Sequence, residues 1–449
     1  MQKKKETTMP IINNNAAGID VGSRSHFIAI GQSSEEVKEF GVNTDGHQAA
    51  IDYLRNNQIT SIAMESTGSY WQSLFRVLQQ EGFEVLLVPG NQTKNARGKT
   101  DVKDCQWIQK LHSLGLLTGS FLPDEQTLKL RNIQRHRSSL IETAAKYTNK
   151  IQKALRLMNI RLDVSIRDIA GKTGRAIIES ILEGERNPSE LVKLVDARVK
   201  KSKQEIEKNL CGQWDEELLY ELKDCYDLLK IHEQKIKDCD LKIDSILQQQ
   251  TMHIGFDVNT SLAKKQNKGK HQCRIDLQKY CYQIYGTDIF AINGVSVSTA
   301  LNLISEIGLS IYKFDSAKKF TSWLRLSPNN KISGGKILSS RTEKSKNVLT
   351  KALRDAANAV GLSKKDDYIA MFFRKIAFKK GRGAAITATA RKIAIILWNM
   401  IVKKQPYNPI KTHEYIEQLK QKKIKFLKKD IQKYNISINE LSMNYAEVR

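Results

Sequence analysis

The chain has 449 residues, which is long enough for two or three domains, and its hydrophobic fraction of 40% excludes a disordered polymer. It contains no run of about 18 or more apolar residues, so the sequence predicts no membrane span. Nothing at its N-terminus suggests secretion. The net charge of +25 indicates a polyanionic partner, with nucleic acid as the leading candidate and an ordinary basic protein as the alternative.

The cysteines indicate packing rather than metal binding. None of the six belongs to a Cys-x-x-Cys pair, which argues against a zinc site. Three of them are spaced by fourteen residues, or two heptads, as a repeated packing position would be. Reduced thiols in the cytosol are the simplest account of the set. The six are Cys105, Cys211, Cys225, Cys239, Cys273 and Cys281.

The first quarter of the chain predicts a mixed α/β sheet. After a disordered leader (1–15), residues 16–126 form the predicted α/β domain. Its apolar runs and turn residues predict three strands, then helix, strand, helix, strand and helix, so that the first three strands form a meander. The strands are predicted within residues 17–23, 26–31, 37–42, 61–65 and 83–88, and the helices over 46–56, over 70–80 and from Thr100 onward.

Two acidic residues interrupt the predicted strands. Asp20 lies inside the first strand, and Glu65 is the last residue of the fourth. An unpaired carboxylate in an apolar strand is costly, so both positions suggest a function, although Asp20 could also serve a cap or turn.

Two further acids begin the last helix of this domain. Asp101 and Asp104 are three residues apart, so both side chains can reach one point in space. The simpler alternative is that acids in a first helical turn only satisfy the helix dipole and its free N–H groups.

The four acids together predict a metal site. The ends of the first and fourth strands can lie side by side, and the helix can bring Asp101 and Asp104 to the same edge. Converging carboxylates repel one another unless cations lie between them. Two Mg²⁺ ions roughly 3.5–4 Å apart are typical of such sites in enzymes that cleave phosphodiesters.

The motifs around these acids resemble a known family. They are Ile19-Asp-Val-Gly, Glu65-Ser-Thr-Gly-Ser-Tyr and Lys99-Thr-Asp-Val-Lys-Asp. The order of elements is similar to the RNase H-like fold, and the motifs resemble the RuvC-like DEDD domain of the insertion-sequence transposases of family one hundred and ten. This resemblance implies that Asp20, Glu65, Asp101 and Asp104 are catalytic and bind Mg²⁺, with two ions per site.

The middle of the chain, residues 127–250, is predicted to be helical. Apolar residues alternate at steps of four and three, which predicts a coiled coil. His232 falls on this seam and is expected to tune its register rather than bind a ligand. The partner of the seam, an intramolecular helix or a second subunit, is left open. Residues 251–276 are predicted to be a basic linker. The seam comprises Leu218, Leu222, Cys225, Leu229, His232, Ile236, Cys239, Ile243 and Ile246.

A mainly α-helical C-terminal domain is predicted over residues 277–405. Gly294 lies in a turn that leads into a helix and resembles the phosphate contact of a helix-hairpin-helix motif, with an ordinary helix N-terminus as the alternative. Two more helices are predicted, over 346–360 and 387–402. The basic tail, 406–449, has helical spacing and is expected to be a solvated helix, with nucleic acid as a possible contact.

Ser333 is the candidate nucleophile of this domain. It precedes two glycines in a polar loop, and basic side chains suited to a phosphate surround it. The stretch Leu326-Ser-Pro-x4-Ser-Gly-Gly-Lys is similar to the transposase segment whose serine is the nucleophile in the same family. Ser327, Ser339 and Ser340 match this pattern less well.

The resemblance implies a DNA transposase or recombinase that is cytoplasmic and associated with the bacterial nucleoid. Ser333 would attack a DNA phosphate, a structured bridge RNA would guide donor and target DNA, and the chain would form a dimer or tetramer. The alternatives are a metal-dependent junction resolvase that uses water, and a non-catalytic nucleic-acid-binding scaffold. Candidate nucleic-acid contacts are Lys94, Arg97, Lys99, Lys103, Gly294, Lys331, Lys336, Arg341, Lys379, Lys380 and Arg382.

Overall fold

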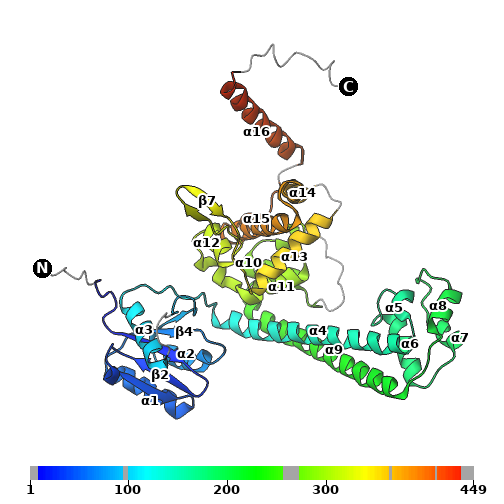
Figure 1. Cartoon of the computed structure of the whole chain (residues 1–449), viewed down its shortest axis with the longest axis horizontal. Helices are drawn as coiled ribbons and strands as arrows, with labels where there is room; N and C mark the ends of the chain where they lie inside the picture. Colours follow the sequence, from blue (N-terminus) through cyan, green and yellow to red (C-terminus); the bar gives the residue numbers. More distant parts are fainter. Residues whose placement is uncertain (1–8, 95–99, 256–272, 364–366, 410–411, 436–449) are drawn as a thin grey trace. The chain divides into compact units, whose positions relative to one another are not determined.

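The computed structural model describes residues 9–94, 100–255, 273–363, 367–409 and 412–435 (Figure 1). The chain divides into two compact units, Met1–Leu122 and Pro123–Arg449. Two candidate contacts, Arg97 and Lys99, and most of the predicted basic linker lie outside the described residues.

The first unit is built on a five-stranded sheet in the order β3-β2-β1-β4-β5. The first three strands pair antiparallel, whereas β4 runs parallel to β1 and β5 runs parallel to β4. This confirms the predicted mixed sheet with an N-terminal meander. The strands are β1 (Ala16–Val21), β2 (Ser25–Ala29), β3 (Val37–Gly41), β4 (Ser61–Glu65) and β5 (Glu84–Val88).

Helices cover both faces of this sheet. Alternate residues of β1 point to opposite faces. Ile19 belongs to the apolar cluster that includes Leu54 and Leu74 of two helices, and Gly18, on the other face, abuts the backbone of a third. The helices are α1 (Thr44–Asn56), α2 (Trp71–Gln80) and α3 (Asp101–Ser113), and a short 3-10 turn, η1 (Ser34–Glu36), precedes β3.

The predicted leader over residues 1–15 is too long. The N–H groups of Ile12 and Asn13 donate to the carbonyl of Ser113, at 2.8 and 3.0 Å, and the Asn13 side chain donates to the carbonyl of His112. Ile12 and Asn13 are therefore bound to the end of α3, mainly through backbone groups, and a hydropathy pattern does not reveal such contacts.

The second unit begins with two long helices, α4 (Glu125–Leu157) and α9 (Glu216–Thr251), which pack along each other. The predicted seam on α9 is mostly buried, and α4 of the same chain packs against it. Supercoiling of the pair stays a prediction. Short helices connect the two at one end: α5 (Leu162–Ser165), α6 (Lys172–Leu182), α7 (Pro188–Leu191), η2 (Val192–Leu194) and α8 (Lys203–Leu210).

Ion pairs with buried carboxylates connect α4 to its neighbours. The Arg137 guanidinium donates to Asp240 of α9 at 2.6 Å, with side-chain exposures of 5% and 11%. Arg131 and Arg135 both bind Glu306, which lies at the end of a helix farther along the chain. These contacts join the long helices to the C-terminal part of the unit.

The C-terminal part is a group of short helices and one hairpin. The sequence predicted two helices after residue 345, whereas the structure has three before the tail. The elements are α10 (Leu277–Tyr285), η3 (Ile289–Ala291), α11 (Val297–Glu306), η4 (Gly308–Lys313), α12 (Ala317–Trp323), β6 (Lys331–Ser333), β7 (Lys336–Ser339), α13 (Val348–Leu362), α14 (Tyr368–Lys380), α15 (Arg382–Val402) and α16 (Thr412–Lys433).

Helix α15 is long and apolar enough to cross a membrane by length and composition alone, although the sequence predicted no span. Half of its most apolar window is buried, and it packs against α12, α13 and α14. Buried residues such as Leu397 and Ile401 lie on this helix. Such burial is that of a core helix in a folded domain.

Candidate catalytic site

Asp20 and Glu65 lie at the ends of neighbouring strands. The parallel register pairs Ile19 of β1 with Met64 of β4, and each acid follows this pair by one residue. Both side chains are half-buried. The predicted meeting of these two acids therefore follows from the strand register.

Helix α3 brings the other two acids to the same place. A Cβ on Gly18 would lie only 2.5 Å from the carbonyl oxygen of Cys105, so a glycine lets α3 pack directly on β1. Asp20 lies two residues beyond Gly18, and Asp101 and Asp104 lie in the first turn of α3, just before Cys105. The cap of α3 is Thr100, whose side chain accepts the N–H of Lys103, so capping does not account for either acid.

The pKa of Asp20 shows that the four carboxylates act on one another. Burial, followed by the charges of Glu65, Asp101 and Asp104 in that order, raises its pKa from 3.8 to about 6. The neighbouring Cys105 thiol is unsuited to chemistry, because burial and the charge of Asp20 raise its pKa to about 12. The acids thus form a mutually repelling cluster at one edge of the sheet.

Two threonines that sequence reasoning missed hold Glu65. The hydroxyl of Thr67 donates to one carboxylate oxygen at 2.8 Å, and the buried hydroxyl of Thr93 donates to the other. The loop that carries Thr93 is anchored by Gln92, whose amide exchanges two hydrogen bonds with the backbone of Thr118. Thr67 belongs to the Glu-Ser-Thr-Gly motif, but no local pattern links Thr93 to Glu65.

The donor set suits a hard divalent cation. Carboxylate oxygens are the ligands that Mg²⁺ prefers, and a cation would relieve the repulsion that raises the pKa of Asp20. Within the described ranges, however, no three Asp, Glu, His or Cys side chains converge closely enough to hold one ion. Joint binding would therefore need the side chains of Asp20, Asp101 and Asp104 to rotate toward Glu65, whose carboxylate the two threonines hold in place.

Ser333 ends the first strand of a hairpin rather than lying in the predicted polar loop. It pairs with Lys336 across β6 and β7, and the two residues between them, Gly334 and Gly335, have φ of 53° and 75°. Two consecutive positive φ values are typical of a type I′ turn, which explains the glycines without a ligand. Ser333 is exposed in the second unit.

The alternative serines are placed differently. Ser327 is half-buried, and its hydroxyl lies 3.1 Å from that of Thr321. The hydroxyl of Ser339 accepts the N–H of Arg341. Ser340 is exposed, like Ser333, but follows the end of β7.

The remaining candidate nucleic-acid contacts are a packed glycine and a set of exposed basic side chains. Gly294 has a φ of 90°, and a Cβ there would lie 2.7 Å from the carbonyl oxygen of Ala356 on α13, so its position has a packing reason. The neighbouring Asn293 donates to Asp367, an acid that would disfavour a phosphate at this turn. The basic candidates that the structure describes are all exposed: Lys94, Lys103, Lys331, Lys336, Arg341, Lys379, Lys380 and Arg382.

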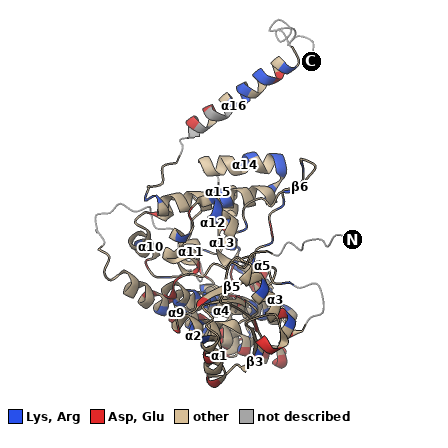
Figure 2. Cartoon of the chain, turned by 90° about the vertical axis from the view of Figure 1, so that its left-hand side faces the viewer, with Lys and Arg blue, Asp and Glu red and all other residues tan. Residues whose placement is uncertain are grey.

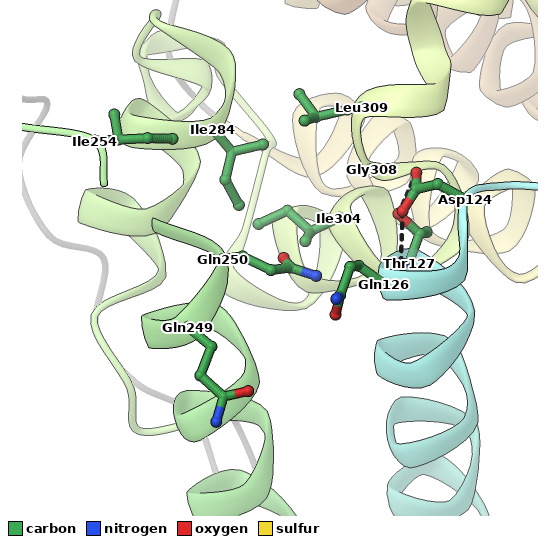
Figure 3. A pocket seen from close by; sticks show the side chains of 10 residues that line it. All are labelled: Asp124, Gln126, Thr127, Gln249, Gln250, Ile254, Ile284, Ile304, Gly308 and Leu309. Atoms are coloured by element: carbon green, nitrogen blue, oxygen red, sulfur yellow. Dashed lines mark hydrogen bonds between the residues drawn. The ribbon is translucent and has the colours of Figure 1, made fainter. Parts of the chain in front are cut away.

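A cavity of about 260 Å³ lies elsewhere in the second unit (Figure 3). Glutamine and aliphatic side chains dominate its walls, together with Asp124. The carboxylate of Asp124 already accepts hydrogen bonds from Thr127 and Ser310. This lining offers no constellation for phosphoryl transfer.

Comparisons with known proteins match two separate parts of the chain. A family model for the DEDD-type transposase domain of IS110, described as a transposase, matches residues 17–160, which include all four acids. A second model, described as transposase IS116/IS110/IS902 family, matches residues 287–373, which include Ser333. The first match suggests an RNase H-like fold for the sheet. Among curated proteins, no match is found.

Proposed function

The chain carries two transposase domains of the IS110 family, and from this premise we propose that it exchanges DNA strands through its acidic cluster and a serine nucleophile. The observation that supports this most is the coupling of Glu65, Asp101 and Asp104 to Asp20. Acids that repel one another at a sheet edge, in a transposase domain, have a clear use in binding cations at a phosphate.

Asp20, Glu65, Asp101 and Asp104 would hold Mg²⁺, which when bound stabilises charge at the reacting phosphate. Thr67 and Thr93 orient Glu65 toward this role. The strand register and the contact at Gly18 support this role, because they bring the ends of β1 and β4 close to the start of α3 without an ion.

Ser333 supplies the attacking oxygen in this proposal. A bond forms between its Oγ and a DNA phosphorus, and the bond from that phosphorus to one deoxyribose oxygen breaks. The serine proton passes to a base, and the leaving oxygen takes up a proton. The covalent phosphoserine keeps the energy of the phosphodiester, so strands can be resealed without ATP. The two units that carry Ser333 and the acids would meet within one chain or across subunits.

The partners are part of the same proposal. The net charge of +25 suits donor and target DNA together with a structured guide RNA. Base pairing by that RNA would select the sequence, so the protein would need no base-reading helix of its own. Dimers or tetramers would bring two DNA ends together.

Purified protein with element DNA, the flanking transcript and Mg²⁺ tests the proposal. Wild type and Ser340→Ala, a matched exposed serine, should form a protein–DNA adduct that mass spectrometry maps to Ser333. Ser333→Ala should bind DNA equally but form no adduct and no exchanged strands. Asp104→Asn should form neither the adduct nor exchanged strands, while its affinity for DNA stays unchanged.

Two results would contradict it. Nicking that persists in Ser333→Ala without any adduct in the wild type would favour a resolvase that uses water. Full activity of Asp104→Asn in cells would favour a scaffold without an acidic active site.

A further inference from the structure

The β6–β7 hairpin exposes apolar side chains that its own domain does not cover. Ile332 is 61% exposed, Ile337 62% and Leu338 70%. In Figure 1 the hairpin projects past the neighbouring helices α12 and α15. Three exposed aliphatic residues within one short hairpin are unusual for a surface that meets only water.

The pairing of the strands sorts these side chains by face. Ile332 lies opposite Ile337, and Ser333 lies opposite Lys336. Directly opposed residues point to the same side of a ribbon, and successive residues alternate. The isoleucine pair therefore occupies one face, and Ser333 and Lys336, together with Leu338, occupy the other. The tight turn at Gly334 and Gly335 keeps the end of the hairpin narrow.

The charges around the hairpin identify the kind of partner. The surrounding stretch contains one acid, Glu343, whose carboxylate lies 3.6 Å from the guanidinium of Arg325. All other charged residues of this stretch are basic. This charge favours a polyanion as the partner of the hairpin over an apolar protein surface. The basic residues of this stretch are Arg325, Lys331, Lys336, Arg341, Lys344 and Lys346.

We propose that this hairpin is a wedge that inserts Ile332 and Ile337 between DNA bases, next to the phosphate that Ser333 contacts. Aliphatic side chains flanked by cations unstack base steps in this way, and the lysines hold the adjacent phosphates. Unstacking bends the backbone and exposes a phosphodiester on the opposite face of the ribbon, where Ser333 and Lys336 lie. The position of the wedge at the reacting phosphate rests on the proposed function, but the insertion itself does not.

Fluorescence of 2-aminopurine, placed in turn at each position around the exchange site, measures the insertion with the full-length protein. Wild type should raise the signal about twofold or more at one step, because unstacking relieves quenching. Ile332→Thr/Ile337→Thr keeps two β-branched residues and should abolish the rise. Ile332→Leu/Ile337→Leu should retain it, and Leu241→Gln, a change at a 70% exposed site on α9, should leave it unchanged.

The controls separate this inference from the proposed function. Ser333→Ala should keep the fluorescence rise and lose only the adduct. A wild type that binds DNA without a rise at any step would overturn the wedge, as would an undiminished rise in the threonine double variant. A change of oligomeric state in that variant, with fluorescence unchanged, would instead assign the apolar face to a second copy of the chain.

Discussion

Asp20 and Glu65 end two neighbouring parallel strands, and the charge of Glu65 helps to raise the pKa of Asp20. This relationship needs both the register of β1 on β4 and the burial of the strand ends. Two acids that are far apart in the sequence thereby affect each other's charge, and the pKa of Asp20 measures this effect.

Glu65→Gln should lower the pKa of Asp20 from about 6 toward its ordinary 3.8, because one of the repelling charges disappears. Carbon-13 NMR titration of the aspartate carboxyls, in EDTA, measures it. The variant Glu81→Gln removes an acid of the same unit that lies outside the cluster and serves as control. An unchanged Asp20 titration in Glu65→Gln would show that the acids are not coupled.

The same shift predicts a pH effect on stability. Asp20 has a raised pKa in the folded state. Its contribution to the stability of the fold is therefore full below a pH of about 3.8 and is lost as the pH rises through about 6. Above that pH, Asp20→Asn should stabilise the first unit by on the order of 1 kcal/mol, since solvent screens a half-buried site. Hydrogen exchange of β1 amides in metal-free buffer tests this. Equal protection in both proteins at pH 8 would refute it.

A buried histidine pair predicts that stability depends on pH in the opposite direction. The rings of His26 and His47 stack with their centroids 5.7 Å apart. Among the described residues, both ring nitrogens of His26 and Nε2 of His47 have no hydrogen-bond partner. Burial, followed by the charge of His47, lowers the pKa of His26 from 6.5 to about 4. Stability therefore falls as the pH falls from 6.5 to 4, because the unfolded chain binds the proton more readily.

His26→Phe should remove that fall, and exchange of the β2 amides at pH 5 against pH 7 measures it. His136→Phe, on α4 in the other unit, is the matched control. A pH dependence of β2 exchange that is the same in His26→Phe and wild type would contradict the assignment.

Breaking the Arg137–Asp240 pair should destabilise the helical unit strongly. Arg137→Met leaves a buried carboxylate without its main partner and should cost roughly 3–5 kcal/mol in urea unfolding. Adding Asp240→Leu should recover most of the loss. Lys129→Met, which breaks an exposed pair with Glu125, should change stability by only about 0.5 kcal/mol. A loss in the double variant as large as in Arg137→Met would argue against a charge effect.

Thr93→Val should weaken cation binding at the acidic cluster by about 10-fold, because Glu65 loses the hydroxyl that orients it. Terbium luminescence, with Mg²⁺ as competitor, measures affinity apart from activity. Thr60→Val, at an exposed threonine of the same unit, should bind like wild type. Equal affinity of all three proteins would show that Thr93 does not position the cluster.

Several features were beyond prediction for identifiable reasons. Strands of three and four residues are too short to show a period, so the hairpin that carries Ser333 was expected as a loop. Helix α14 was missed because its apolar and basic residues intermix. The partner of the α9 seam was left open, since a heptad pattern identifies a face and not what covers it.

The sequence by itself determined the order of strands and helices in the first unit and the positions of its four acids, because turn residues and apolar periodicity act over a few neighbours. The sequence predicted that Asp20 and Glu65 can meet, but only the tertiary structure decided the strand register at which they do, that α3 rests on Gly18, and that Thr93 holds Glu65. These contacts join residues far apart in the chain. They depend on strand register and close backbone packing, which arise when the whole unit folds and which no local pattern specifies.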